Sequence, residues 1–263
     1  MNTDEIKDLV RARYGSIATA ASDSCCGPAT SCCGPAPEVD AKSSRMGYTA
    51  AELGAVPEGA NLGLGCGNPQ AIAALHPGEV LVDLGSGAGF DCLLAARQFG
   101  SGGRVIGVDM THEMLKKARD NAARIGAGNV EFRLGELEHL PVADNTADVI
   151  ISNCVINLVP DKPQVFREAL RVLKPGGRLA IADVVNIAPL PAELASDKAL
   201  LCGCVAGAAS PAALEGWLAA AGFVDVSIAV KPESREYVAT WAAGRGIENY
   251  VCSATIEARK PAA

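Results

Sequence analysis

The stretch of sequence that decides the fold is VLVDLGSGAGFD, at positions 80–91. Its first five residues are mostly apolar and predict a buried strand, and the residues after the glycines begin a helix. Gly85 and Gly87 let the backbone turn tightly and let a ligand approach bare N–H groups. Asp109 lies twenty positions after Gly89, where a carboxylate can accept hydrogen bonds from both hydroxyls of a ribose. The stretch therefore predicts a nucleotide-containing ligand at a strand-to-helix turn.

Strands and helices alternate outward from this turn. Helical connections of about ten residues between short apolar runs predict parallel β-α-β units with right-handed crossovers. The chain is therefore expected to fold as an α/β protein around a mostly parallel sheet. We expect strands over 80–84, 104–109, 130–134, 147–152, 178–184, 224–230 and 250–258, and helices over 4–21, 90–99, 113–125, 163–173 and 211–221.

The composition excludes several classes of function. Lys and Arg number 23 against 30 Asp and Glu, and no basic stripe is visible, which argues against a nucleic-acid-binding surface. No run of about 18 uncharged apolar residues occurs, so the sequence predicts no membrane-spanning helix and no membrane partner. The opening residues MNTDEIKD are charged where a signal peptide would be apolar, so we expect a cytoplasmic protein.

Ten cysteines in 263 residues are fewer than a disulfide scaffold carries. In a reducing compartment such thiols are typically ligands or redox groups. Cys154 follows the expected strand 147–152, at the carboxyl edge of the sheet where α/β proteins bind their ligands. A thiol there is a poor general base but a good soft ligand, although a buried cysteine can also be a small apolar core residue.

Further cysteines lie at turns and not inside regular elements. Cys66 lies in a glycine turn, and Cys202 and Cys204 lie in 199–207, whose small residues predict a flexible segment. Adjacent cysteines chelate a tetrahedral ion awkwardly and no C-x-x-C pair occurs, so a zinc site is disfavoured. The Gly-, Pro- and Ser-rich stretch 22–45 is expected to be a mobile loop, and it repeats Cys-Cys-Gly-Pro to contribute Cys25, Cys26, Cys32 and Cys33.

The glycine turn fits one class of cofactor better than its main alternative. The dinucleotide fingerprint G-x-G-x-x-G is not met, because the third glycine arrives one residue early, at Gly89. Asp83, inside the strand before the turn, suits a cationic amino-acid group better than a pyrophosphate. The pattern D-x-G-x-G-x-G with a downstream acid resembles the S-adenosylmethionine-dependent methyltransferases of the Rossmann-like class. A bare strand-to-helix turn, or an NAD site with a shifted glycine, is the alternative.

A narrower resemblance, to the arsenite methyltransferases, covers essentially the whole chain. It implies a Rossmann-like class I methyltransferase sheet, mostly parallel with one antiparallel strand, together with a cysteine-bearing N-terminal segment and a small C-terminal α+β region. The segments that carry this resemblance are DLGSGAGFDC at 83–92, GVDMT at 107–111, NCVINLVPDK at 153–162 and CVAGA at 204–208.

The same resemblance implies three regions. Residues 1–70 form the N-terminal helix, cysteine-rich loop and cap, 71–188 the S-adenosylmethionine-binding core, and 189–263 the C-terminal arsenic-binding segment with the last strands. The thiols implied as arsenic ligands are Cys66, Cys154 and Cys204, and those implied as accessory or redox-relay thiols are Cys25, Cys26, Cys32, Cys33 and Cys202. Either Cys202 or Cys204 could be the ligand, although the Val-Ala-Gly-Ala that follows favours Cys204.

The implied reaction is methyl transfer from S-adenosylmethionine to trivalent arsenic, as arsenite or its thiol conjugates, to give methylated arsenicals for detoxification. A thiol reductant, thioredoxin or a glutathione-like small thiol, would reopen any disulfide that forms, and we expect a monomer. The methyl-donor site is expected to comprise Asp83, Gly85, Ser86, Gly87, Gly89, Asp109, Met110, Leu137, Glu138 and Asn153.

Two other functions are compatible with the residues. One is a class I methyltransferase acting on a carbon or oxygen acceptor, with incidental cysteines. The other is a thiol-rich protein that sequesters or senses metalloids, which the doubled Cys-Cys-Gly-Pro motif fits and the methyl-donor turn does not. Consumption of S-adenosylmethionine in step with arsenite would separate these alternatives.

Overall fold

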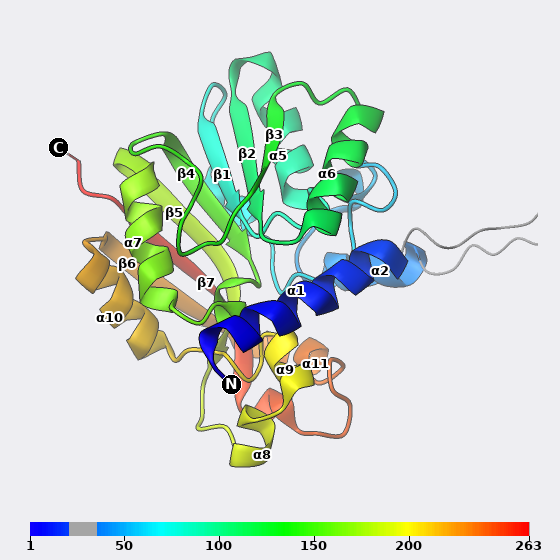
Figure 1. Cartoon of the computed structure of the whole chain (residues 1–263), viewed down its shortest axis with the longest axis vertical. Coiled ribbons are helices and arrows are strands. Elements are labelled where there is room, and N and C mark those ends of the chain that lie inside the picture. The colour runs from blue at the N-terminus through cyan, green and yellow to red at the C-terminus, as the bar shows by residue number, and fades with distance from the viewer. Residues whose placement is uncertain (21–35, 263) are drawn as a thin grey trace, which may run out of the picture.

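A seven-stranded sheet with helices on both faces organises the chain (Figure 1). The computed structural model describes residues 1–20 and 36–262. The strands are β1 (Val80–Leu84), β2 (Arg104–Asp109), β3 (Val130–Leu134), β4 (Ala147–Asn153), β5 (Leu173–Asn186), β6 (Val224–Lys231) and β7 (Val251–Arg259). The longer helices are α1 (Thr3–Ala20), α2 (Ala36–Arg45), α5 (Phe90–Phe99), α6 (His112–Arg124), α7 (Lys162–Val172) and α10 (Pro211–Ala221).

Short helical turns complete the described chain. Those of α-helical type are α3 (Ala50–Leu53), α4 (Gln70–Ala73), α8 (Ala192–Ala195), α9 (Lys198–Cys202) and α11 (Arg235–Val238). Those of 3-10 type are η1 (Gly100–Gly102), η2 (Ile156–Leu158), η3 (Pro232–Ser234) and η4 (Ile247–Asn249). No helix within the described residues is both long and apolar enough to cross a membrane.

The strand order is β3-β2-β1-β4-β5-β7-β6. Strands β1 to β5 pair in parallel, whereas β7 runs antiparallel to both β5 and β6, so the predicted mostly parallel sheet with one antiparallel strand is confirmed. The chain winds outward in opposite directions from the adjacent strands β1 and β4. Such a reversal leaves a crevice at the carboxyl ends of the two strands, where ligands of open α/β sheets bind.

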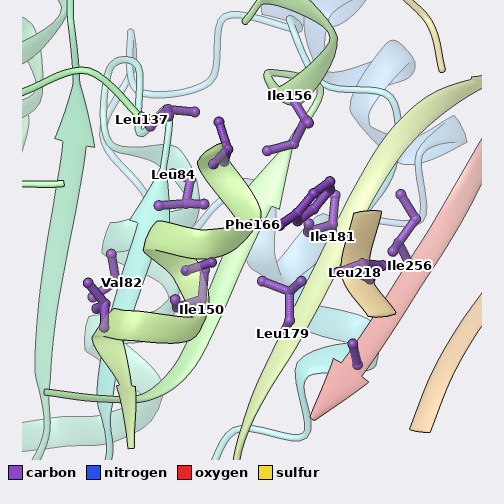
Figure 2. Packing of buried hydrophobic residues seen from close by; sticks show 14 of the residues in the cluster. Val82, Leu84, Leu137, Ile150, Ile156, Phe166, Leu179, Ile181, Leu218 and Ile256 are labelled. Carbon is purple, nitrogen blue, oxygen red and sulfur yellow. The ribbon is translucent and has the colours of Figure 1, made fainter. Parts of the chain in front are cut away.

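Both faces of the sheet are buried, and alternate residues of β1 pack against opposite faces. Val82 and Leu84 belong to the cluster that includes Phe166 of α7, whereas Leu81 packs in the cluster under α5 and α6. Figure 2 shows the aromatic ring of Phe166 beside Ile181 of β5. A strand buried on both faces reads as a continuous apolar run, which is why β1 was predictable from its sequence.

Three expectations about local structure were wrong. Residues 36–45, expected to belong to a mobile loop, form α2, whose Glu38 in the first turn and Arg45 in the last turn match the helix dipole. Strand β5 begins five residues early, because Leu173 pairs with Ala147 before the Pro-Gly-Gly bulge. The segment 199–207, expected to be flexible, begins as a helix, because α9 extends to position 202. The Asp197 carboxylate caps this helix by accepting hydrogen bonds from the N–H groups of Ala199 and Leu200.

The boundaries of the three predicted regions stay a prediction. Strands β6 and β7, which come from the predicted C-terminal region, are hydrogen-bonded into the same sheet as the core strands. The predicted loop thiols Cys25, Cys26, Cys32 and Cys33 lie outside the described residues.

Candidate active site

A cavity opens at the carboxyl ends of β1, β2 and β4, and residues of α1 form part of its wall. Figure 1 shows α1 running past this edge of the sheet. Helix α1 contributes Lys7, Val10 and Tyr14 to the cavity wall. The Lys7 ammonium lies 2.6 Å from a carboxylate oxygen of Glu136 and 3.1 Å from one of Glu138, which ties α1 to the loop after β3. The predicted methyl-donor residues that line the cavity are Asp83, Gly85, Ser86, Gly87, Asp109, Met110, Leu137, Glu138 and Asn153.

Gly89 is the one predicted methyl-donor residue that does not line this cavity. It is the N-cap of α5, with a φ of 89°, and a Cβ built there would lie 2.9 Å from the ring of Phe132. The glycine is thus required for the close packing of the turn against β3, which is a structural role.

The glycine turn carries a buried polar atom, the Ser86 hydroxyl, that lies against Gly107 of β2. The N–H groups of Gly85 and Ser86 donate to the Val108 carbonyl, at 2.8 and 3.0 Å, which binds the turn to β2. The Ser86 Oγ is buried, and among the described residues it has no hydrogen-bond partner. A buried hydroxyl without a partner costs roughly 1–3 kcal/mol.

Two carboxylates at the strand ends are placed for different parts of a ligand. The Asp109 carboxylate accepts from the N–H groups of Gly87 and Thr111, at 2.9 and 2.8 Å, and lies at the end of β2. Burial raises the pKa of Asp109. Burial, together with the charge of Asp91, raises the pKa of Asp83 well above its ordinary value, and the Cys92 thiol donates to this carboxylate at 3.2 Å. A cationic ligand would offset this crowding of negative charge.

Sequence reasoning missed a buried polar network beside Asp83. The Tyr48 hydroxyl donates to the Asp91 carboxylate at 2.8 Å, and the Asn153 amide donates to the Tyr48 oxygen at 3.0 Å. Gln70 Nε2 donates to Asp91 at 2.9 Å. These partners come from four separate segments of the chain. The one signal in the sequence was an acidic residue, Asp91, at the start of an apolar helix.

Three thiols converge behind this network. Cys66 comes from the turn before α4, Cys154 from the end of β4, and Cys204 from the turn after α9. The sulfurs of Cys66 and Cys154 lie within 4.8 Å of each other, and Cys66, Cys154 and Cys204 are all buried. The Cys204 thiol also donates to the Cys154 carbonyl at 2.9 Å. Residues from three segments thus form one thiol cluster, which we define as Cys66, Cys154 and Cys204.

The backbone of the thiol cluster is strained. Cys154 and Cys204 have φ values of 58° and 62°, a region that non-glycine residues avoid at a cost of roughly 1–3 kcal/mol each. The buried Asp183 carboxylate holds the turn after Cys154, because it accepts from the Ile156 N–H at 3.0 Å and from the Asn157 amide at 2.9 Å. Such strain persists where the fold over-determines it, which is common at functional sites.

Asp183 is a further residue that sequence reasoning missed. One of its carboxylate oxygens and the sulfurs of Cys66 and Cys154 lie within 4.8 Å of one another. Burial raises the pKa of Asp183 to about 7, against the lowering effect of the N–H groups of Val184 and Ile156. The signal in the sequence was an acidic residue in the apolar run of β5, where a charge is tolerated only with partners.

The thiols of the cluster hold their protons at neutral pH. Burial raises the pKa of Cys66 to about 11. The neighbouring Cys204 thiol lowers the pKa of Cys154, but the neighbouring Cys66 thiol and burial outweigh it, so the net pKa lies well above 9.0. The neighbouring Cys154 thiol and burial raise the pKa of Cys204 well above 9.0. The cluster is therefore uncharged until a ligand displaces its protons.

The remaining described cysteines lie elsewhere. Cys202 is buried at the end of α9, and its carbonyl accepts a hydrogen bond from Tyr14 at 3.2 Å. Its neighbour Cys204 donates its thiol proton to the Cys154 carbonyl. Cys92 lies under Asp83, and Cys252 is buried in β7. Of the two cysteines between which the sequence left a choice, Cys204 is thus the one in the thiol cluster.

Known proteins resemble this chain in sequence and in fold. A family model described as a methyltransferase domain matches residues 75–222. An arsenite methyltransferase of Halobacterium salinarum is 53% identical over 265 residues, which cover 98% of this chain and 68% of that protein. An arsenite methyltransferase of Homo sapiens is 44% identical over 137 residues, 49% of this chain and 36% of that protein. The solved structure of an arsenic (III) S-adenosylmethionine methyltransferase from Chlamydomonas reinhardtii matches with a TM-score of 0.58 and 31% identity, covering 86% of this chain and 73% of that one.

Proposed function

The chain belongs to the arsenite methyltransferase family, and from this premise we propose that it transfers methyl groups from S-adenosylmethionine to trivalent arsenic held by Cys66, Cys154 and Cys204. The products are methylated arsenicals, and the role is detoxification. The observation that carries the proposal is the convergence of three buried thiols beside a cavity lined by the glycine turn.

The cavity residues fit S-adenosylmethionine. Its ammonium and sulfonium cations suit the crowded carboxylates Asp83 and Asp91, and its ribose hydroxyls suit Asp109. We propose that Met110, Leu137 and Glu138 border the adenine, together with Gly85 and Gly87 at the turn and Asn153 at the methionine end.

Trivalent arsenic suits the thiol cluster because soft thiolates bind soft ions preferentially. Each As–O bond of arsenite that gives way to an As–S bond releases one water, because the departing hydroxide takes the thiol proton. A separate general base is therefore unnecessary, although all three thiols are protonated at neutral pH. The three described histidines lie outside the cavity lining, in agreement with this chemistry.

Position is the main contribution of the protein to the methyl transfer. When bound, S-adenosylmethionine supplies an electrophilic methyl group on a sulfonium. Cys154 lies on the cavity wall, whereas Cys66 and Cys204 lie behind it. Arsenic bound to three thiolates keeps a lone pair. Because Cys154 lies on the cavity wall, we propose that this lone pair faces the cavity. Holding two reactants in line can supply about 7–11 kcal/mol of the barrier.

Methyl transfer raises arsenic to the pentavalent state, so a second chemical step must return it. We propose that a pair of accessory thiols reduces the product and becomes a disulfide, which thioredoxin or a small thiol reopens. The candidates are Cys25, Cys26, Cys32, Cys33 and Cys202. Because this cycle needs reduced thiols, we propose a cytoplasmic location, and we propose that the enzyme acts as a monomer.

Speciation of arsenic tests the proposal. Purified protein is incubated with arsenite, S-adenosylmethionine and a thiol, and the arsenicals are separated and quantified for the wild type, Cys154→Ser and Cys252→Ala. We expect methylated arsenic from the wild type and from Cys252→Ala, whose cysteine is equally buried but lies in β7. We expect none from Cys154→Ser, although it binds S-adenosylmethionine as tightly as the wild type. Unchanged methylation by Cys154→Ser would overturn the assigned ligand set.

A further inference from the structure

A buried carboxylate lies beside the thiol cluster and outside the cavity at the glycine turn. Asp183 is 2% exposed, and one of its carboxylate oxygens lies within 4.8 Å of the sulfurs of Cys66 and Cys154. Cys154 lines the cavity, whereas Asp183 and Cys66 do not. An arsenic atom bonded to both sulfurs would therefore have the Asp183 carboxylate near it, and the cavity would lie on its Cys154 side.

The contacts of Asp183 are those of an ionised carboxylate. The N–H groups of Ile156 and Val184 donate to it at 3.0 and 2.7 Å, and the Asn157 amide donates to it at 2.9 Å. All three groups are donors, so they match the two oxygens of the anion, whereas an acid proton would find no acceptor among them. Hydrogen bonds to the charged form favour that form. The fold thus holds a fixed negative charge beside the thiols.

The charge of Asp183 acts on every sulfur of the thiol cluster. After burial and the neighbouring thiols, it also raises the pKa of Cys66, Cys154 and Cys204. An anion that disfavours a thiolate at each of these sulfurs favours a cation bonded to them, because the Coulomb energy changes sign with the charge. Lys162, whose charge interacts with both Asp183 and Cys204, is a cation that partly offsets this effect.

Methyl transfer moves a positive charge from the donor to arsenic. The arsenic lone pair forms the As–C bond, while the C–S bond of the sulfonium breaks and its electron pair stays on the donor sulfur. Arsenic on three thiolates is neutral before this step and carries one positive charge after it. The carboxylates of Asp83 and Asp91, on the donor side, favour the cation before transfer and therefore oppose its departure. An anion on the arsenic side offsets this opposition.

We propose that Asp183 stabilises the positive charge that develops on arsenic during methyl transfer. This inference rests on the proposed function and adds a residue that acts on the transfer step itself. The carboxylate acts through its charge and forms no bond to arsenic. Because three donors already hold it in place, no reorganisation is needed when the charge arrives, which is the condition for electrostatic stabilisation of a transition state. Arsenite binding creates no net charge, so it does not depend on Asp183 in this way.

The test measures single-turnover methylation at pH 8 by the wild type and Asp183→Asn, each loaded with arsenite and saturated with S-adenosylmethionine. Asparagine keeps an acceptor for Val184 and Asn157, since both donate to the same carboxylate oxygen. We expect the rate of methyl transfer to fall about 100-fold, as when one preorganised charge-stabilising group is removed. The affinities for arsenite and S-adenosylmethionine should be unchanged, and X-ray absorption should still show three sulfur neighbours around arsenic.

A second variant changes the opposite charge and keeps Asp183. Lys162→Met removes the offsetting cation and retains an apolar stem of similar length. We expect methyl transfer to become about threefold faster, the size of a weak ion-pair interaction, and we expect no such gain in the Asp183→Asn background. The matched control is Lys116→Met, an exposed cation of α6 paired with Asp120, which should leave the rate unchanged.

These variants separate a role for charge from a purely structural role. An unchanged rate in Asp183→Asn would overturn the inference. A rate that Lys162→Met leaves unchanged or lowers would also overturn it, whether or not Asp183→Asn keeps three sulfur neighbours around arsenic. Failure of the wild type to methylate bound arsenic would instead overturn the proposed function.

Discussion

The substitution Asn153→Ala would separate two thiols of the cluster without removing either. The Asn153 side chain accepts from the Cys66 N–H at 3.0 Å, and it donates to the Gly67 carbonyl at 2.8 Å and to the Tyr48 oxygen at 3.0 Å. It thereby fixes the turn that carries Cys66 against the strand that leads to Cys154. Alanine would leave the N–H of Cys66 and the carbonyl of Gly67 without partners, and both residues are buried.

Each such orphaned buried group costs roughly 1–3 kcal/mol, so we expect Asn153→Ala to lower the free energy of unfolding by about 2–4 kcal/mol. Urea unfolding, with the midpoint shift taken at an unchanged m-value, measures this loss. A thiol displaced by about 1 Å would lower kcat by about 100-fold. A loss below about 0.5 kcal/mol, together with unchanged arsenic methylation, would refute the view that Asn153 joins the two thiols.

Three further predictions follow from single contacts. Gly89→Ala places a Cβ 2.9 Å from the ring of Phe132 at a φ of 89°, so urea unfolding should show a loss of about 2–4 kcal/mol, and a loss under about 0.5 kcal/mol would contradict the packing argument. The pKa of Cys66 is raised to about 11, above its ordinary 9.0, so its alkylation rate should still rise between about pH 10 and 11, where an exposed thiol has levelled off. By the same linkage, the stabilisation from the protonated thiol is present below pH 9 and is lost as the pH rises to 11, and Cys66→Ala should lack this part of the pH dependence of unfolding. Lys7→Met breaks a pair with the nearly buried Glu138, so the KM for S-adenosylmethionine should rise several-fold with little change in kcat, and an unchanged KM would show that α1 does not help to hold the donor.

The elements around the glycine turn were predictable because their signals are local. The bounds of β1, β2, β3, α5 and α10 were correct, since apolar runs, a glycine turn and helix caps all act within a few residues. Helix α2 was missed because its Gly- and Pro-rich surroundings masked the acidic start and basic end of a helix. The sequence placed Cys154 at a strand end, and the topology of the sheet confirms that position.

The polar support of the thiol cluster was not predictable in the same way. Asp183 reaches the turn after Cys154 because β4 and β5 pair with Asn153 opposite Ala182. Asp91 meets Tyr48 across 43 positions of sequence. Contacts of this kind depend on strand register and on how a loop folds back, neither of which leaves a local pattern.

The most direct test of the central claim is X-ray absorption at the arsenic edge of the wild-type protein loaded with one equivalent of arsenite. We expect three sulfur neighbours around arsenic in the wild type and in Cys252→Ala, and two sulfurs with one oxygen in Cys66→Ala, Cys154→Ala or Cys204→Ala. Three sulfur neighbours retained in Cys154→Ala, or arsenic bonded chiefly to oxygen in the wild type, would contradict the thiol cluster as the arsenic site.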